Sequence, residues 1–386
     1  MALLMSLTAM SIDIMLPALP DIGATLGVGI AGNLPLVVSC FMFGAAIGQL
    51  VWGPLADRYG RRRPLLAGLA LFAAATLIAI AAQDFSQLLA ARFVQGIGGS
   101  VGRIIVTAVV RDLFAGREMA RTTSTVMMVF ITVPILAPAV GQIIILIGTW
   151  RWIFAVLLTA ALTAFLWAGL RLPETQPPLS PGSRRHTLGE ALHLVISNRA
   201  TLGYGIAQGF VFGLLVAYIA SAQQVFGVAY GLGPLFPFAF GSVALAIAAA
   251  SFTNSRLVQR IGMRRLSHTA LVAFLLLSTL MAGLAAWMPL PFWVALAGIA
   301  ACFFLYGLML SNFNAIAMQP MGAAAGMAAS LTGSYSMASG ALFGTLIARA
   351  FDGTVLPLFT GFAVLSLCAL ITVFIIEGRA GLLRGE

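Results

Sequence analysis

Residues 53–63 read GPLADRYGRRR, and part of this stretch is repeated in the second half of the chain. Residues 259–265 read QRIGMRR, so the Arg, Gly, Arg and Arg at positions 58, 60, 62 and 63 recur 202 residues later. Each copy lies at the end of a long apolar run. A short match says little by itself, but its equivalent place in the two halves indicates an internal repeat.

The composition around these two stretches is that of a membrane protein. Of the 386 residues, 61% are hydrophobic and only 8% are charged, and the mean hydropathy is +1.03. An ordinary soluble domain carries about a quarter charged residues. All 21 basic residues are arginines in short clusters between apolar runs, so the net charge of +10 indicates a bilayer and not nucleic acid. This composition excludes a soluble enzyme, a disordered protein and a nucleic-acid-binding module.

The apolar runs predict an all-α membrane protein. A transmembrane helix needs about 20 apolar residues, and the chain offers twelve such runs. We expect helices at 1–20, 32–54, 64–82, 86–110, 120–147, 152–171, 200–225, 233–254, 267–287, 291–313, 325–350 and 354–376.

The longest polar stretch, 172–199, contains PETQPPLSPGSRRH and separates six predicted helices from six. We therefore expect an N-terminal six-helix bundle at 1–171, a flexible cytoplasmic loop at 172–199, a C-terminal six-helix bundle at 200–376 and a cytoplasmic tail at 377–386. With the first loop outside, 17 arginines fall on the inner side and two on the outer side. Because cytoplasmic loops carry the arginine excess, both termini are expected in the cytoplasm.

The stretch at 53–63 resembles the loop signature of the major facilitator superfamily, G-x-L-a-D-r-x-G-r-r. Further stretches resemble the Bcr/CflA branch of drug:H⁺ antiporters: SIDIMLPALPDI from residue 11, RFVQGIGG from 92, AVVRDLF from 108, PILAPAVGQ from 134 and AIAMQPMG from 315. The resemblance covers nearly the whole chain and implies two six-helix bundles in a bacterial inner membrane. One stretch departs from the pattern, because the antiporter motif G-P-x-x-G-G corresponds here to APAVGQ at 137–142.

Asp13 is the only acidic residue well inside a predicted span, and it lies about 12 Å deeper than Asp21. Ionisable groups in a bilayer are costly and usually functional. A carboxylate facing a partly dry cavity could bind and release protons or attract a cationic substrate, but it could also be a structural partner for Arg92. The resemblance implies that this acid takes part in proton coupling and that Arg92 tunes it.

Polar residues on other helices are candidates for a substrate cavity. Arg92, Gln95, Gly99 and Arg103 have the spacing of one helical face, although Arg103 could equally snorkel to the interface. The second half offers aromatic walls with few polar groups, which suit an apolar or amphipathic ligand. The predicted cavity residues are Gln95, Gly99, Arg103, Tyr204, Gln208, Tyr218, Tyr306, Asn312 and Tyr335.

The loop at 53–63 is a candidate gate. Asp57 can pair with a nearby arginine or with the positive end of a helix, and the resemblance implies a latch between the halves on the cytoplasmic side. The alternative is that the arginines only set the topology. Pro134 and Pro138 should kink the fifth helix. The predicted gating residues are Gly53, Asp57, Arg58, Gly60, Arg61, Arg62, Pro134, Pro138 and Gly141.

Metal and cofactor chemistry has no sequence support. Without lysine the chain has no phosphate-binding G-x-x-x-x-G-K-[ST] motif, and its Cys, His and Glu residues lack metal-ligand spacing. The three histidines, at 186, 193 and 268, lie in or beside the central loop or at a helix end and receive no role. We expect no enzyme, no cofactor and no metal. The expected partners are a small-molecule substrate, protons and the lipid bilayer, and a monomer would suffice.

Three functions remain open. The first is a proton-coupled antiporter that exports small, largely apolar drugs by alternating access and so confers antibiotic resistance. The second is a transporter for a metabolite, such as a sugar or amino-acid derivative, working as an exporter or an H⁺ symporter. The third is a membrane receptor or scaffold that transports nothing, which would not need Asp13 and Arg92 inside the membrane.

Overall fold

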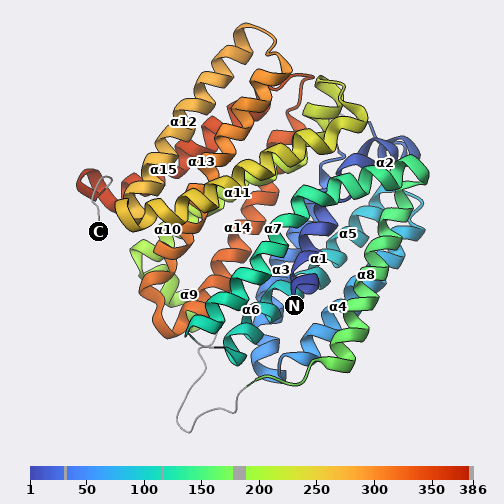
Figure 1. Ribbon diagram of the computed structural model, residues 1–386, viewed down its shortest axis with the longest axis vertical. Coiled ribbons are helices and arrows are strands. Elements are labelled where there is room, and N and C mark those ends of the chain that lie inside the picture. The colour runs from blue at the N-terminus through green and yellow to red at the C-terminus, as the bar shows by residue number, and fades with distance from the viewer. Residues whose placement is uncertain (30–32, 115, 177–187, 382–386) are drawn as a thin grey trace. The chain divides into compact units, whose positions relative to one another are not determined.

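The computed structural model describes the chain apart from residues 30–32, 115, 177–187 and 382–386, so parts of the predicted central loop and tail lie outside the described residues. The described residues form helices and connecting turns, with no strand among them. The chain divides into two compact units, Met1–Thr187 and Leu188–Glu386. Figure 1 shows each unit as a bundle of long helices.

The N-terminal unit contains six long apolar segments, two of which are made of consecutive helices. The bounds are α1 Ala2–Asp13, η1 Leu16–Ala18, α2 Leu19–Leu26, α3 Leu36–Tyr59, α4 Arg62–Ala81, α5 Phe85–Gly99, α6 Val101–Leu113, α7 Gly116–Ile147 and α8 Trp150–Arg171.

The C-terminal unit begins with a short helix and continues with six long ones. The bounds are α9 Leu188–Ser197, α10 Arg199–Ala222, the π-helix η2 Gln223–Ala229, η3 Gly233–Leu235, α11 Phe236–Ile261, α12 Met263–Trp287, α13 Phe292–Met318, η4 Gln319–Ala324, α14 Ala325–Arg349 and α15 Leu356–Gly381.

The predicted all-α fold is confirmed, because described helices occupy most of each of the twelve predicted ranges. Ten of the described helical segments are long and apolar enough to cross a membrane. The remaining two, α7 and α14, span 32 and 25 residues. The helix α9 was not predicted. It lies within 172–199 and packs through Val195 against Met321 and Ala328 of its own unit.

The first helix is broken in its middle, where a single span over 1–20 was expected. An α-helix would need an N–H at residue 17 to bond the carbonyl of Asp13, but residue 17 is proline and has none. The backbone therefore ends α1 at Asp13, passes through the short 3-10 helix η1 and resumes as α2. This break places a carboxylate at the end of a helix inside an apolar segment.

The two units repeat one packing pattern. In the N-terminal unit, α5 packs on α3 and α4, α4 packs on α8, and α1 packs on α7. In the C-terminal unit, α13 packs on α11 and α12, α12 packs on α15, and α10 packs on α14. Counted within each unit, these are the second–fourth, third–fourth, third–sixth and first–fifth helix pairs. The repeat read from two short loops therefore extends to the packing of the helices.

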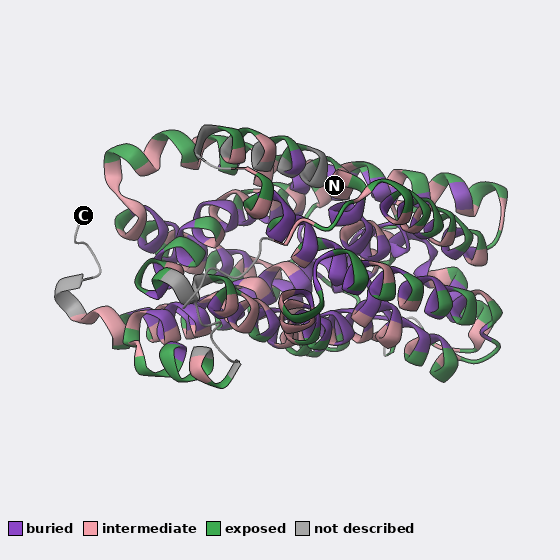
Figure 2. Ribbon diagram, turned by 90° about the horizontal axis from the view of Figure 1, so that it is seen from below, coloured by how far each residue is buried: buried purple, intermediate pink, exposed green. Residues whose placement is uncertain are grey.

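Many large apolar residues of the helices are exposed. Figure 2 shows exposed positions along the helices in green. Leu170 is 83% exposed and Trp287 is 86% exposed. A water-soluble monomer rarely exposes so much contiguous apolar surface, whereas lipid tails cover it without cost. The exposed faces are those of a multi-pass membrane protein.

Candidate functional site

Asp13 lies at the C-terminal end of α1 and is buried, with 3% of its surface exposed. Among the described residues, no hydrogen-bond or ion-pair partner reaches its carboxylate. A helix C-terminus carries partial negative charge, so it does not help to hold an ionised carboxylate. The break in the first helix thus creates a buried acid whose charge no described side chain compensates, which is an arrangement suited to taking up a proton.

α7 crosses the first helix directly beside this acid. A side-chain carbon built on Gly141 would overlap the carbonyl oxygen of Ile14, the residue after Asp13, so only glycine permits the approach. Pro134 and Pro138 both lie inside α7, where each lacks the N–H that a helix interior would use. The predicted gating residue Gly141 therefore lies next to the predicted coupling residue.

Arg92 is fully buried in α5 and ties three helices together. Its Nε donates to the Val37 carbonyl at 3.1 Å, its Nη2 to the Ser11 carbonyl at 3.1 Å and its Nη1 to Gln95 Oε1 at 2.6 Å. The guanidinium also lies 4.4 Å from the ring centroid of Phe41. All these partners are uncharged, so the charge of Arg92 is solvated by dipoles and a ring and is not neutralised by an acid.

Arg92, on α5, therefore contacts the first helix close to Asp13 without pairing with its carboxylate. Arg92 holds the carbonyl of Ser11, two residues before Asp13, and no ion pair joins the two side chains among the described contacts. A buried charge without a counter-ion is costly. Arg92 therefore carries a buried charge close to the helix end that holds Asp13.

The other predicted residues of this helical face separate at a helix junction. Gln95 is buried and extends the hydrogen-bond network of Arg92, because its Nε2 donates to Thr76 Oγ1 at 2.7 Å. Gly99 ends α5, and its carbonyl accepts from Thr8 Oγ1 at 2.8 Å. Arg103 belongs to the next helix, α6, and is exposed. Three of the four residues are thus fixed inside the unit, and Arg103 is the accessible one.

A second polar cluster lies where the loop between α3 and α4 meets the end of α6. Arg61 donates from Nη1 to Asp57 at 2.6 Å and from Nε to Asp112 at 2.8 Å. Burial alone would lower the pKa of Arg61, but the hydrogen bonds and charges of these two carboxylates raise it above its ordinary value. Arg61 therefore remains charged and clamps two helix ends. Sequence reasoning found Asp57 and missed Asp112, although Asp112 lies within the quoted stretch AVVRDLF.

Glu174 completes this cluster from the segment after α8. Its carboxylate accepts the backbone N–H groups of Arg61 at 2.7 Å and of Arg62 at 3.2 Å, which are free donors at the start of α4. Partial burial raises the pKa of Glu174, but four backbone hydrogen bonds outweigh it and hold the pKa below its ordinary value. Gly60, with φ of +88°, passes so close that any side chain would overlap this carboxylate.

The remaining loop residues have simpler roles. Arg62 donates to the Gly169 carbonyl of α8, Arg58 lies 5.3 Å from the ring centroid of Tyr59, and Gly53 lies within α3. All of these contacts are internal to the N-terminal unit. The described contacts therefore make the loop a clamp on α3, α4, α6 and the end of α8.

In the C-terminal unit, Tyr204 lies in a buried network that the sequence did not indicate. Its hydroxyl donates to Glu377 Oε1 at 2.9 Å and lies 2.9 Å from His268 Nε2. Arg264 forms an ion pair with Glu377 through Nε at 3.5 Å. The network joins α10, α12 and α15. The sequence assigns His268 no role, because its partners come from other helices and its local sequence does not indicate them.

The other predicted residues of this unit differ in accessibility. Tyr218 is buried among the rings of Phe226, Phe240 and Phe303. Tyr306 is buried beside the same cluster, and Asn312 donates to Asn254 Oδ1 at 2.7 Å. By contrast, Tyr335 is 42% exposed, and Gln208 is half-buried. Gln208 and Tyr335 are therefore the two that can meet a ligand without rearrangement of the unit.

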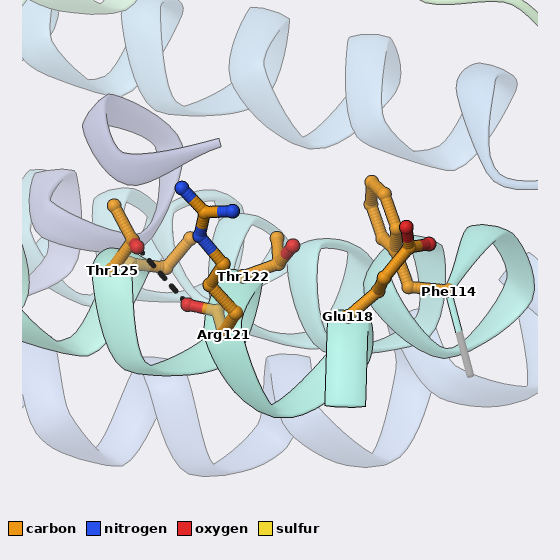
Figure 3. Close-up of a pocket in the computed structure, with 6 residues that line it drawn as sticks. Phe114, Glu118, Arg121, Thr122 and Thr125 are labelled. Carbon is orange, nitrogen blue, oxygen red and sulfur yellow. Dashed lines mark hydrogen bonds between the residues drawn. The ribbon is translucent and has the colours of Figure 1, made fainter. Parts of the chain in front are cut away.

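Figure 3 shows a cavity of about 330 Å³ at the start of α7, which none of the predicted residues lines. Its walls are Phe114, Glu118, Arg121, Thr122, Thr125 and Val126. The carboxylate of Glu118 lies beside the Phe114 ring, and the Arg121 guanidinium points away from it. The lining is open and its charged residues are exposed, so it is a surface recess at the end of a span and not an enclosed binding site.

Two repeated units of membrane-length helices, with a broken first helix and a buried acid, define a multi-pass membrane transporter. The chain belongs to the Major Facilitator Superfamily, whose sequence model matches residues 1–348. It is accordingly a transporter of small molecules and not an enzyme.

Known relatives and solved structures agree with this family. The chain is 32% identical to the bicyclomycin resistance protein homolog of Haemophilus influenzae, over 97% of this chain and 93% of that protein. It is 32% identical to the uncharacterized MFS-type transporter YdgK of Bacillus subtilis, over 90% and 87%, and 28% identical to multidrug resistance protein D of Escherichia coli, over 86% and 83%. The fold matches the nucleoside transporter NupG with a TM-score of 0.75 at 14% identity, over 97% of both chains. These relatives bear out the resemblance to the Bcr/CflA branch.

Proposed function

We propose that this chain is a proton-coupled antiporter that exports small, largely apolar drugs by alternating access. The observation that carries the proposal is Asp13, a buried acid at a break in a membrane-spanning helix, with no partner among the residues that the structure describes. Discontinuous helices with ionisable groups are the places where transporters bind substrates and coupling ions. The relatives named for bicyclomycin resistance and multidrug resistance support a drug as the cargo.

In the proposed cycle, Asp13 takes up a proton from the outer side and releases it to the cytoplasm. The uncharged partners of Arg92 leave its positive charge in place. While Asp13 is ionised, the two buried charges sum to nearly zero. Once Asp13 binds a proton, a net positive charge remains. Because α7 crosses the first helix closely at Gly141, the change of charge at Asp13 can move α7. The cluster of Asp57, Arg61 and Asp112 serves as a gate, and Gln208 and Tyr335 contact the substrate. We place both termini in the cytoplasm, with the protein in a bacterial inner membrane.

Proton flux in everted membrane vesicles tests this function. Respiration acidifies the vesicles, a pH-sensitive dye reports the gradient, and candidate substrates are added in turn: bicyclomycin, an amphenicol, a sulfonamide, a cationic dye, a sugar and a nucleoside. We expect dequenching by at least one drug with the wild type and none with Asp13→Asn. Asp21→Asn is the matched control, because Asp21 is an exposed acid on the neighbouring α2 and should leave the response unchanged.

Each other outcome points elsewhere. Dequenching by the sugar or the nucleoside alone would replace the drug with a metabolite. Dequenching by a drug that persists in Asp13→Asn would keep the antiporter and remove this carboxylate from the coupling mechanism. A wild type that responds to none of the compounds contradicts the proposal for the whole panel.

A further inference from the structure

The span that begins with α10 leaves the α-helical path over Gln223–Ala229, where the backbone forms a π-helix. The amide of Tyr230 bonds the carbonyl of Val225, and the amide of Leu232 bonds that of Phe226. Such wide turns are rare and occur frequently at functional sites. The wider turn rotates the helix, and it changes which side chains the segment presents on each side.

One side of this segment is fixed by aromatic packing. Phe226 is fully buried, and its ring centroid lies 6.3 Å from that of Tyr218 and 6.4 Å from that of Phe236. Gln223 and Gly227 are only half-buried. Phe226 fixes one side of the segment. The wide turn then determines where Gln223 and Gly227 lie on the other side.

The side-chain amide of Gln223 lies over Gly227. A Cβ built on Gly227 would be 2.5 Å from Gln223 Nε2, so the missing side chain makes room for the amide. The amide oxygen, Oε1, is buried and has no hydrogen-bond partner among the described residues. Lipid tails cannot satisfy such an acceptor, and leaving it open within a membrane span is costly. An open acceptor held at a special turn therefore indicates a donor that comes from outside the chain.

The surroundings indicate which kind of donor fits. Within the described part of the chain, Gln208 on the same span has a second buried amide oxygen without a hydrogen-bond partner, and the Ser336 hydroxyl of the adjoining α14 also has none. The described stretches of α10, the π-helix and α14 contain no acidic residue. Neutral acceptors without an acid suit an uncharged donor, such as a hydroxyl or an amide N–H, better than a cation.

We propose that Gln223 is a substrate-binding residue that accepts a hydrogen bond from a hydroxyl group of an uncharged substrate. The inference rests on the proposed drug export and adds its specificity: among otherwise similar molecules, those with a free hydroxyl are selected. A site built to bond a donor rejects the analogue that lacks it. Since Oε1 is covered in the described conformation, the substrate reaches it in another state of the transport cycle.

Binding of two matched compounds tests this inference. The full-length protein is placed in nanodiscs of phosphatidylethanolamine and phosphatidylglycerol, and calorimetry measures the Kd of chloramphenicol, which has two hydroxyls, and of its diacetyl ester, which has none. We expect the wild type to prefer the diol. Gln223→Met should reduce that preference about 3- to 10-fold, the effect of one neutral hydrogen bond. Gly227→Ala should do the same, because its methyl group displaces the amide.

Val228→Ala is the control, since Val228 is 46% exposed on the same segment and should leave the preference unchanged. Thermal unfolding confirms that each variant is folded, and Gln223→Asn, which withdraws the amide, replaces any Gln223→Met protein that is not. A preference that survives both Gln223 variants overturns the inference while leaving drug export intact. A wild type that binds both compounds equally also overturns it. A wild type that binds neither contradicts drug export for this class and the inference with it.

Discussion

At the scale of single residues, Arg92 and Glu174 show how a charged group can be held by neutral partners. Arg92 donates to two carbonyls and one amide, and Glu174 accepts backbone N–H groups. The sequence identified Asp13 and Arg92 as unusual because ionisable residues are rare inside apolar runs. It could not reveal Asp112, His268, Glu174 or Glu377, because each acquires its partners from a different helix.

A substitution at Gly60 tests whether the Glu174 carboxylate is held against the loop between α3 and α4. Gly60 has φ of +88° and ψ of 174°, a conformation almost restricted to glycine, so Gly60→Ala should destabilise the protein by about 1–3 kcal/mol, with a further loss because the methyl group overlaps the Glu174 carboxylate. Thermal unfolding in detergent measures the change. Gly378→Ala is the control: its φ of +66° and ψ of 179° are close to those of Gly60, and nothing lies within 4 Å of the added methyl group, so it should show the backbone cost alone. Equal losses in the two variants would mean that Glu174 is not held against this loop.

At the scale of elements, sequence patterns predict the long helices well and their irregularities poorly. Apolar length is sufficient to locate the twelve predicted ranges. The break at Asp13 follows from Pro17, but hydropathy does not register it because both pieces are apolar. The π-helix from Gln223 packs Phe226 against rings from other segments, contacts that the local composition does not reveal. The helix α9 lies in a polar stretch and depends on burying Val195.

Pro17 should matter for coupling and not for folding. Pro17→Ala restores the N–H that can bond the carbonyl of Asp13, which favours one continuous helix. We expect the thermal stability to be maintained and the drug-driven proton flux in everted vesicles to fall about tenfold, because the acid is no longer at a helix end. Pro64→Ala should retain full flux, since Pro64 lies in the first turn of α4, where N–H groups have no helical partner. Unchanged flux in Pro17→Ala would show that the break is not required.

The carboxylate of Glu174 should give the start of α4 a pH-dependent stability. Its pKa is held below the ordinary value of 4.5, so the folded state binds the proton less tightly than the unfolded state. The stabilisation is therefore present above pH 4.5 and is lost as the pH falls below it. Because the group is largely exposed, we expect only about 1 to 3 °C between wild type and Glu174→Gln at pH 7. The difference should narrow between pH 4.5 and 3.5. A constant difference over that range would exclude the capping role.

At the scale of the whole molecule, the internal repeat extends beyond the short sequence match that indicates it. Gly60 and Gly262 both have a positive φ, of +88° and +84°. Glu174, after the last helix of the N-terminal unit, contacts the loop that follows α3, and Glu377, at the end of the last helix of the C-terminal unit, contacts Arg264 after α11. The loops match in sequence, whereas the two glutamates correspond only in space. Each unit therefore closes its own helix ends with an acid of its own.

This closure predicts that each unit folds on its own core and that the link between them can be cut. We expect residues 1–180 and 181–386, co-expressed as separate chains, to retain at least about half of the wild-type drug-driven proton flux, because the cut leaves the Glu174 contacts and α9 intact. Either chain alone should give none. A cut between α12 and α13, at residues 289 and 290, is the control. It divides helices that pack within one unit, so it should reduce flux and protein yield more strongly. If the first cut abolishes flux while both chains reach the membrane, the covalent link itself takes part in transport.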